Sequence, residues 1–267
     1  MKENDGCLMR KRQKPMKTAV RFLLMVSVCV MIFSWYKMRE SIQIYAEGDQ
    51  NYEQLQKQIR HPVEAAVSDS EALPLVNIPS ISIDFEMLQK VNADAAAWLY
   101  CPDTEIDYPV MRSDDYNWYL HHLPDGTYHA NGTLFLDYNC PPDFSGRLNI
   151  IYGHHMKSGK MFGSLVRYKE QKYFEQHPSL YLYTEQGNYR IDLKYGCVIG
   201  ADQWRDQAFM YTGNLEALLS YASSKTTFVS STEYTDRDKF IVLSTCSYEF
   251  DDARYIVIGV LRPEYGA

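Results

Sequence analysis

A long series of short strand-like segments, which begins at Ile81, constrains the fold of this chain more than any other feature. Aliphatic and aromatic residues fill the segments, and Gly, Pro, Asn and Asp separate one from the next. Many short strands at this spacing are typical of a β-barrel or a β-sandwich. The clearest segments are 132–137, 147–153, 179–184, 189–200, 239–246 and 254–261. After Ile81, helical patterns occur only at 85–92, 161–177 and 214–225, so we predict a mainly β domain with flanking helices.

The N-terminal part has the composition of a membrane anchor. Residues 22–36 carry no charge, and the apolar run continues towards the N-terminus beyond Arg21. Spanning a bilayer takes about 20 apolar residues, a length that the segment reaches if Arg21 extends its charged end to the interface. Residues 1–21 hold seven Lys and Arg, so the positive-inside rule places the N-terminus in the cytoplasm and the chain after Lys37 outside. A signal peptide cleaved near Ala46 is the alternative.

A polar helix and a spacer follow the apolar segment. Residues 49–61 have a helical composition that Pro62 ends, and a stretch rich in Ser, Ala and Pro continues to about Pro79. We therefore divide the chain into a basic cytoplasmic head at 1–21, a transmembrane anchor at 22–38, a helical and spacer segment at 39–77, and an extracytoplasmic domain at 78–267.

The basic head and the rest of the chain differ in charge. Of 27 Lys and Arg and 34 Asp and Glu, residues 1–21 hold seven and two. The remainder therefore carries 20 basic and 32 acidic residues, a net charge of −12. A domain this acidic lacks the basic face that phosphate binding needs, so we expect no nucleic acid among its partners.

The cysteines and histidines do not form a metal motif. The six cysteines, at positions 7, 29, 101, 140, 197 and 246, include no closely spaced pair, so neither a CxxC redox motif nor a zinc motif is present. His121, His122 and His129 lie in a polar stretch without the pattern of a metal site. We expect no metal ion and no cofactor, and we interpret the cysteines at 101, 140 and 197 as structural.

Three reactive residues stand at the ends of predicted strands. The segment 239–246 ends at Cys246, and 254–261 begins at Arg254, with seven residues between them. If these strands pair as antiparallel neighbours, Cys246 and Arg254 lie at the same end of the sheet. His154 directly follows the strand-like segment 147–153. All three side chains can therefore meet at one end of a β structure.

A cysteine, a histidine and an arginine together suit acyl transfer. The thiolate attacks a carbonyl, the imidazolium protonates the leaving amine, and the guanidinium stabilises the oxyanion. With ordinary pKa values, about 3% of thiols are ionised and about a quarter of imidazoles are protonated at pH 7, so fewer than about 1% of molecules would hold both states. Either the pKa values shift or the enzyme is slow, and the charge of Arg254 favours the thiolate.

These residues lie in motifs that resemble the sortase family. Leu243, Ser244, Thr245 and Cys246, followed by Arg254, resemble the sortase signature TLxTC…R; its leading threonine is replaced by valine here. The block 149–162 (NIIYGHHMKSGKMF) resembles the histidine block of class B sortases, in which the histidine directly after glycine is catalytic. The stretch 115–137, together with Trp98 and the segment 108–110, also resembles class B, and the resemblance covers roughly residues 78–262.

The resemblance implies an eight-stranded closed β-barrel and a transpeptidase. Its catalytic residues would be Cys246, His154 and Arg254, with Ser244 and Thr245 lining the peptide groove. The enzyme would cleave surface proteins after the threonine of a C-terminal sorting signal similar to LPxTG or NPxTN. The thioacyl intermediate would then pass to an amine of the cell-wall peptidoglycan (lipid II or a cell-wall peptide) or, in some members, to a pilin.

Several alternatives stay open from the residues alone. His155 is the rival of His154, and Asp251 and Asp252 are candidates to orient the arginine or the histidine, although a solvated turn is the simpler interpretation. An L,D-transpeptidase would carry its cysteine and arginine almost adjacent, whereas seven residues separate Cys246 from Arg254. A membrane-tethered β-domain that binds a ligand such as haem is the non-enzymatic alternative.

Overall fold

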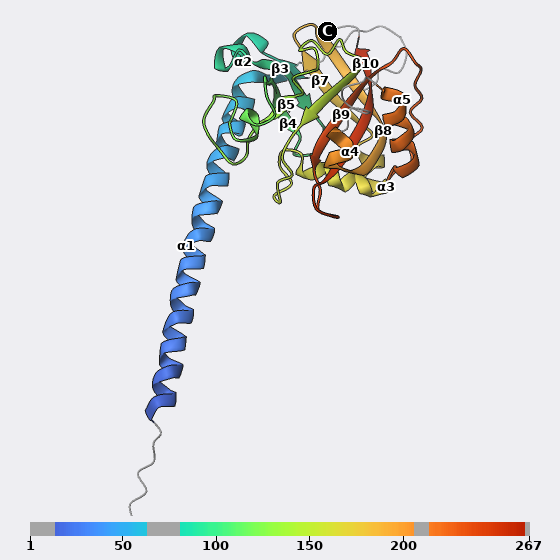
Figure 1. Cartoon of the computed structure of the whole chain (residues 1–267). Helices are drawn as coiled ribbons and strands as arrows, with labels where there is room; N and C mark the ends of the chain where they lie inside the picture. Colours follow the sequence, from blue (N-terminus) through green and yellow to red (C-terminus); the bar gives the residue numbers. More distant parts are fainter. Residues whose placement is uncertain (1–13, 63–80, 206–213, 265–267) are drawn as a thin grey trace, which may run out of the picture. The chain divides into compact units, whose positions relative to one another are not determined.

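The computed structural model describes residues 14–62, 81–205 and 214–264. Our predictions for residues 1–13 of the basic head and 63–79 of the spacer therefore fall outside the described residues. The chain divides into two units, residues 1–47 and 48–267, which we describe separately. The helix α1 (Lys14–Ile59), drawn in blue in Figure 1, begins in the first unit and ends in the second.

In the first unit, α1 presents apolar side chains to its surroundings. Phe22, Leu23 and Phe33 are each more than 60% exposed. By length and composition alone, the stretch Ala19–Ile59 contains a window apolar enough to cross a membrane, with a mean hydropathy of 1.9. The helix also continues through the polar residues that we predicted to be a separate helix at 49–61. The helix ends at Ile59, because the next three residues form the short strand β1 (Arg60–Pro62). This strand pairs with β2 (Ile81–Ile83).

The second unit is built on a closed barrel of eight strands, which confirms the predicted fold class. Around the barrel the strand order is β10-β8-β7-β3-β4-β5-β6-β9. Neighbours pair antiparallel except for β4 with β5 and β6 with β9, which are parallel. The strands are β3 (Ala95–Tyr100), β4 (Asp107–Arg112), β5 (Leu134–Leu136), β6 (Leu148–Tyr152), β7 (Ser179–Thr184), β8 (Gly187–Gly200), β9 (Lys239–Cys246) and β10 (Ala253–Glu264).

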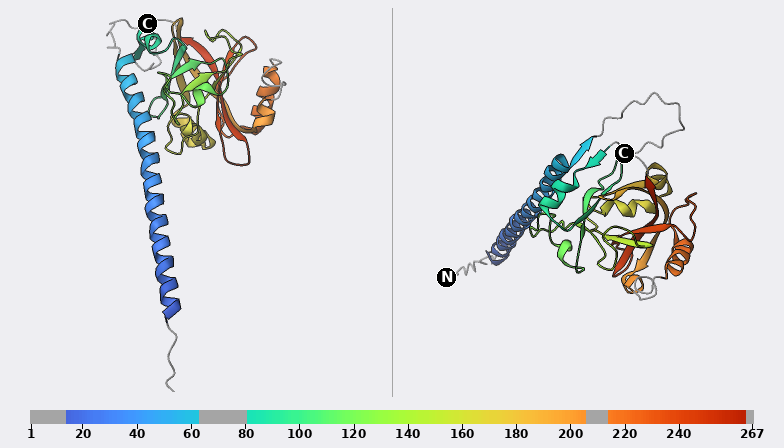
Figure 2. Two further views of the ribbon diagram at one scale, coloured as in Figure 1. Left: turned by 60° about the vertical axis from the view of Figure 1, so that its left-hand side comes forward. Right: turned by 90° about the horizontal axis from the view of Figure 1, so that it is seen from above.

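The strand β9 is buried on both of its faces. Ile241 and Leu243 point into the core inside the barrel, whereas Phe240 and Val242 pack in a second core with Leu218 of helix α5 (Leu215–Lys225). Figure 2 shows α5, in orange, on the outside of the barrel. Burial on two faces explains why this strand reads as a continuous apolar run rather than as an alternating one. Its C-terminal residue, Cys246, therefore stands on a rigid element.

The described helices follow the sequence patterns in part. The helix predicted at 214–225 is α5, and its Asn214 side chain accepts a hydrogen bond from the backbone of Ala217. The pattern at 161–177 forms two short helices that Glu170 separates, because its backbone is extended there. The remaining helical elements are α2 (Phe85–Val91), η1 (Trp118–Leu120), η2 (Gly163–Lys169), α3 (Gln171–Gln176) and α4 (Ala201–Arg205).

The end of α1 packs on the barrel within the second unit. Tyr52, Leu55 and Ile59 are buried. Arg60, the next residue, pairs with the carboxylate of Asp107, which also accepts a hydrogen bond of 2.7 Å from the indole of Trp98. This part of the helix is thus held by apolar contacts and, at its end, by a partly buried charge pair.

Candidate active site

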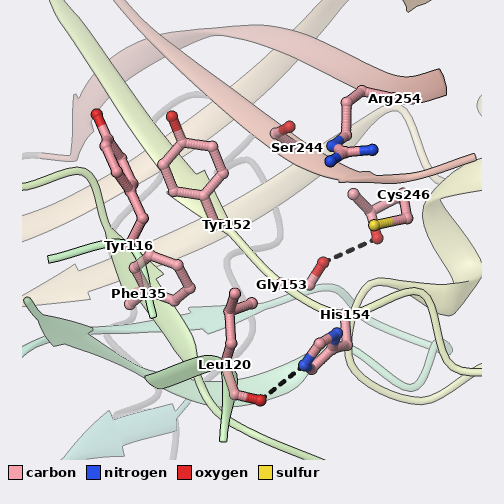
Figure 3. Close-up of a pocket in the computed structure, with 10 residues that line it drawn as sticks. Tyr116, Leu120, Phe135, Tyr152, Gly153, His154, Ser244, Cys246 and Arg254 are labelled. Atoms are coloured by element: carbon pink, nitrogen blue, oxygen red, sulfur yellow. Dashed lines mark hydrogen bonds between the residues drawn. The ribbon is translucent and has the colours of Figure 1, made fainter. Parts of the chain in front are cut away.

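Strand register brings the three predicted catalytic residues to one end of the barrel. Arg254 on β10 lies directly opposite Cys246 on β9. The parallel pairing of β6 with β9 sets Tyr152 beside Ser244, so that His154, two residues further along, reaches the same end as Cys246. Figure 3 shows the three side chains around a common pocket.

The pocket has one apolar wall and one reactive end. Its volume is about 160 Å³. The rings of Tyr116, Phe135 and Tyr152 gather on one side, and Arg254 and Ser244 lie on the other (Figure 3). The complete lining is Tyr116, Leu120, Phe135, Tyr152, Gly153, His154, Ser244, Thr245, Cys246 and Arg254. The two residues that we predicted to line a peptide groove, Ser244 and Thr245, thus face the same space as the reactive residues.

Cys246 differs from the other cysteines of the second unit in its surroundings. It is half-buried at the strand end, whereas Cys101 and Cys197 are fully buried. Burial raises the pKa of Cys101 to about 11 and the pKa of both Cys140 and Cys197 to about 12. These three thiols stay protonated near neutral pH and are poor nucleophiles. Among these thiols, only that of Cys246 lines the pocket with a histidine and an arginine.

The imidazole of His154 is fixed by a backbone carbonyl. Its Nε2 lies 2.7 Å from the carbonyl oxygen of Leu120. A carbonyl only accepts hydrogen bonds, so Nε2 carries a proton and Nδ1 is the nitrogen that can give or take one. Burial lowers the pKa of His154, and a positive charge on His121, whose ring centre lies 6.3 Å away, acts in the same direction. The neutral imidazole is therefore favoured in the resting site.

Arg254 keeps most of its hydrogen-bonding capacity for a ligand. Its Nη1 donates to the carbonyl of Ala253 at 3.1 Å. Within residues 14–62, 81–205 and 214–264, no carboxylate lies within salt-bridge distance of this guanidinium, and both Asp251 and Asp252 are exposed. A guanidinium without a carboxylate partner can stabilise an oxyanion that forms next to Cys246.

The two adjacent histidines have different roles in the structure. His155 does not line the pocket, and its Nδ1 lies 2.8 Å from the carbonyl oxygen of Cys246. Because that carbonyl is an acceptor, His155 donates to it and ties the backbone of the cysteine to the loop after β6. His154 is therefore the histidine that lines the pocket together with Cys246.

Two further hydrogen bonds join the same backbone segments. The hydroxyl of Thr245 donates to the carbonyl of Gly153 at 2.8 Å, and the N–H of Gly153 donates to the carbonyl of Ser244 at 3.2 Å. Glycine fits position 153, because a Cβ atom there would lie 2.3 Å from the side chain of Leu134 and would displace it. Ser244 is 2% exposed, and its buried hydroxyl has no hydrogen-bond partner in the described structure. It is thus the buried polar group that a ligand in the pocket can satisfy.

Several residues of the site were not identified from the sequence. Leu120 supplies the carbonyl that holds His154, and Tyr116 supplies part of the apolar wall. Both lie in the connection between β4 and β5, where no periodic pattern indicates which side chains turn inwards. Phe135 and Tyr152 stand on predicted strands, but only the closure of the barrel shows which way they face. In the described residues, no group of three or more His, Cys, Asp or Glu is placed to hold a metal ion.

Comparison with known proteins defines the family. No model of a known protein family matches the chain. Sortase B of Listeria monocytogenes is 30% identical over 243 residues, which are 90% of this chain and 95% of that protein. Sortase B of Staphylococcus aureus is 25% identical over 255 residues, 94% of this chain and 98% of the relative.

A solved structure agrees with these relatives. The crystal structure of a Bacillus anthracis protein similar to sortase B superposes with a TM-score of 0.66 at 26% identity, and the match covers 82% of this chain and 98% of the other. The Listeria relative reaches 30% identity over nearly its whole length and over most of this chain. The chain therefore belongs to the class B sortases and is a cysteine transpeptidase.

Proposed function

We propose that this transpeptidase cleaves surface proteins within a C-terminal sorting signal similar to LPxTG or NPxTN, and transfers them to an amine of the cell-wall peptidoglycan. The observation that supports this most is the meeting of Cys246, His154 and Arg254 at one pocket with an apolar wall. A nucleophile, a proton carrier and a fixed positive charge are the three groups that acyl transfer to an amine requires.

The first half of the proposed reaction forms a thioester. The thiolate of Cys246 attacks the carbonyl carbon of the signal's threonine, and the negative charge that develops on the oxygen is stabilised by Arg254. When the tetrahedral intermediate collapses, the C–N bond breaks and protonated His154 gives its proton to the leaving amine. The N-terminal part of the substrate then remains on Cys246 as a thioacyl group.

The second half transfers the acyl group. The amine of a peptidoglycan precursor (lipid II or a cell-wall peptide) attacks the thioester, His154 takes the proton of the amine, and the sulfur of Cys246 leaves as thiolate. A pilin lysine is the alternative acceptor amine. A reaction with that acceptor would differ from the one above only in this transfer step. The lowered pKa of His154 makes its protonated form scarce, which fits a slow enzyme.

The pocket has the features needed to hold the signal peptide. A proline two residues before the threonine suits an apolar wall made of Tyr116, Phe135 and Tyr152. We propose that the unpartnered hydroxyl of Ser244 bonds the peptide backbone. Thr245 also lines the pocket, although its hydroxyl donates to Gly153, so we propose that it contributes to the wall of the groove.

We further propose that residues 22–38 anchor the enzyme in the cell membrane as a single span, with the basic head in the cytoplasm and the catalytic domain, 78–267, outside. The exposed apolar side chains of α1 and the charge of the preceding residues support this arrangement. An extracytoplasmic domain can reach both the surface proteins and the peptidoglycan amine.

The test is to incubate the detergent-solubilised full chain with a panel of fluorogenic sorting-signal peptides, and to search for a peptide adduct by mass spectrometry. We expect cleavage after threonine and a thioester adduct on Cys246. Cys246→Ala should lose the adduct and, because the nucleophile is gone, on the order of 10⁴-fold or more in rate. Adding peptidoglycan-peptide or pilin-peptide amines would identify the acceptor.

An absence of adduct would contradict the proposal if Cys246 also failed to react with a small alkylating reagent. Binding of haem or another ligand by such an inert chain would then support the non-enzymatic alternative.

A further inference from the structure

A buried carboxylate stands behind the apolar wall of the pocket. Asp137 directly follows β5 and is 2% exposed. Its Oδ2 accepts hydrogen bonds from the hydroxyl of Tyr152 at 2.8 Å and from the hydroxyl of Tyr116 at 3.1 Å. The rings of both tyrosines line the pocket. A single oxygen atom thus joins residues from β6 and from the connection between β4 and β5.

The other oxygen of this carboxylate is bound locally. Oδ1 accepts from the backbone N–H of Asn139 at 2.9 Å and from its side-chain amide at 3.0 Å. Within the described ranges, no lysine, arginine or histidine lies within salt-bridge distance of Asp137. Burial of a carboxylate without a cation is costly, so hydrogen bonds from neutral donors must offset that cost. The two phenols supply half of these four hydrogen bonds.

The carboxylate restricts how the two rings can lie. An ionised carboxylate only accepts hydrogen bonds, so both phenols must point their O–H groups at Asp137. Burial, together with the charge of Asp137, raises the pKa of Tyr152 well above its ordinary value, so that this phenol remains a donor. The ring of Tyr152 packs edge-on against Tyr116 at 5.8 Å between centres and lies 5.3 Å from Phe135. The orientation of one ring therefore affects the whole wall.

The contact lies away from the reacting atoms. In Figure 3, the hydroxyls of Tyr116 and Tyr152 are at the ends of the rings that are farther from His154. Asp137 itself does not line the pocket and makes no described hydrogen bond to Cys246, His154 or Arg254. Its influence on a bound peptide must therefore pass through the two rings.

We propose that Asp137 is a positioning residue for substrate selection, which holds Tyr116 and Tyr152 in the orientation that shapes the apolar wall. The inference rests on the proposed function, because it assumes that the wall receives the peptide. It assigns to one buried carboxylate an effect on peptide affinity and selectivity that leaves the nucleophile unchanged.

The test compares full-length variants in detergent. Asp137→Asn should raise KM for a cleaved signal peptide by roughly tenfold, the size expected when hydrogen bonds to a charged acceptor are lost, with kcat nearly unchanged. It should also reduce the preference for a peptide with proline two residues before the threonine over the same peptide with alanine there. The rate at which a small reagent alkylates Cys246 should not change.

Two further sets of variants separate positioning from general stability. Tyr116→Phe and Tyr152→Phe remove only the donor atoms, and each should raise KM in the same direction. Adding Asp137→Asn to the double Tyr→Phe variant should have little further effect, because the same contacts are already lost. Asp107→Asn is the matched control: it alters a buried carboxylate that binds Trp98 and Arg60 outside the pocket, and it should lower stability while leaving KM unchanged.

Several outcomes would overturn the proposal. Wild-type KM and selectivity in both Tyr→Phe variants would do so, and this result remains decisive even if Asp137→Asn fails to fold. A slower alkylation of Cys246 in Asp137→Asn would place the effect on the nucleophile instead.

Calorimetric titration of peptides into the Cys246→Ala background separates this inference from the proposed function. Peptides that bind but are not cleaved by the wild-type chain would contradict only the proposed function. The ratio of the Kd values with and without Asp137→Asn would then still test the role of Asp137. Failure of every peptide to bind would overturn both.

Discussion

The two sides of the pocket are built by different means. On one side, Cys246 and Arg254 stand opposite each other on β9 and β10, and the regular pairing of these strands sets their separation. On the other side, Tyr116 and Leu120 lie in the long connection between β4 and β5, where Tyr116 donates to Asp137 and the carbonyl of Leu120 lies 2.7 Å from Nε2 of His154. The residues proposed to carry out the chemistry therefore lie on the strands of the barrel. The residues that shape the rest of the pocket lie largely in the connection between β4 and β5.

Residues that are distant in sequence hold the connection in place. The hydroxyl of Tyr52, on α1, donates to the carbonyl of Gly132, and the N–H of Thr133 donates to the carbonyl of Tyr119 at 2.7 Å. Through these contacts the carbonyl of Leu120 is presented to His154. Changes on the strand side should therefore affect the chemical step strongly, whereas changes on the connection should shift affinity, selectivity and pH dependence by smaller factors.

The largest effect in this comparison is expected at Arg254. Arg254→Gln keeps a hydrogen-bond donor but loses the charge that we propose stabilises the oxyanion, so kcat should fall by about 10²- to 10³-fold. Arg254→Lys keeps the charge and should lose less. Single-turnover acylation with a fluorogenic peptide measures the step directly. Arg262→Gln, which alters an arginine paired with Asp238 on the barrel, is the control and should keep kcat. If Arg254→Gln retained nearly full acylation, the oxyanion would have to be stabilised elsewhere.

A smaller effect is expected at Thr245, which joins β9 to the backbone segment that carries His154. Thr245→Val keeps the shape of the side chain but removes the donor to Gly153, so His154 should be held less well and kcat should fall by about tenfold. Thr227→Val removes a similar hydroxyl that bonds Gly196 and Tyr168, and it should lower stability only. Steady-state measurements of kcat and KM distinguish the two explanations. A rise in KM at constant kcat would mean that the hydroxyl of Thr245 acts on the peptide rather than on His154.

The same contrast explains what the sequence predicts. Cys246, Arg254 and His154 follow or precede strand-like segments, and strands at this spacing can be assigned locally, so their meeting at one end could be predicted before any coordinates. The eight-stranded barrel, implied by the resemblance, is confirmed by the closed strand order. Leu120 and Tyr116 could not be predicted, because their positions depend on contacts with α1 and with Asp137 that no local pattern encodes.

The boundaries of α1 also depend on tertiary contacts that a local sequence pattern does not encode. Residues 49–61 have the composition of an independent polar helix, but nothing in the sequence between Lys37 and Ile59 forces the preceding helix to end. Gly48 is tolerated within α1, where a side chain would clash with His129 at 2.4 Å. The tertiary contact, rather than helix propensity, favours glycine at that position, and the two predicted helices are one.

The smallest effect concerns His121, which lies on the connection next to His154. Burial is the main reason that the pKa of His154 is lowered, and a positive charge on His121 adds to it. The reactive state that we propose needs the imidazolium of His154 together with the thiolate of Cys246. When the pKa of the imidazole lies below that of the thiol, only a small and constant fraction of molecules holds this state between the two values. Raising the pKa of His154 increases that fraction and moves the acid limb of the rate profile to higher pH.

His121→Asn should therefore raise kcat/KM modestly on the plateau and shift the acid limb upwards. The shift runs in this direction because removing a nearby positive charge makes protonation of His154 easier. His122→Asn is the matched control: its ring stacks on Trp118 at 3.7 Å, and it does not contribute to the lowered pKa of His154. The profile of kcat/KM against pH measures both variants. An acid limb that stayed in place in His121→Asn but moved in His122→Asn would mean that the connection acts on the site through structure rather than through charge.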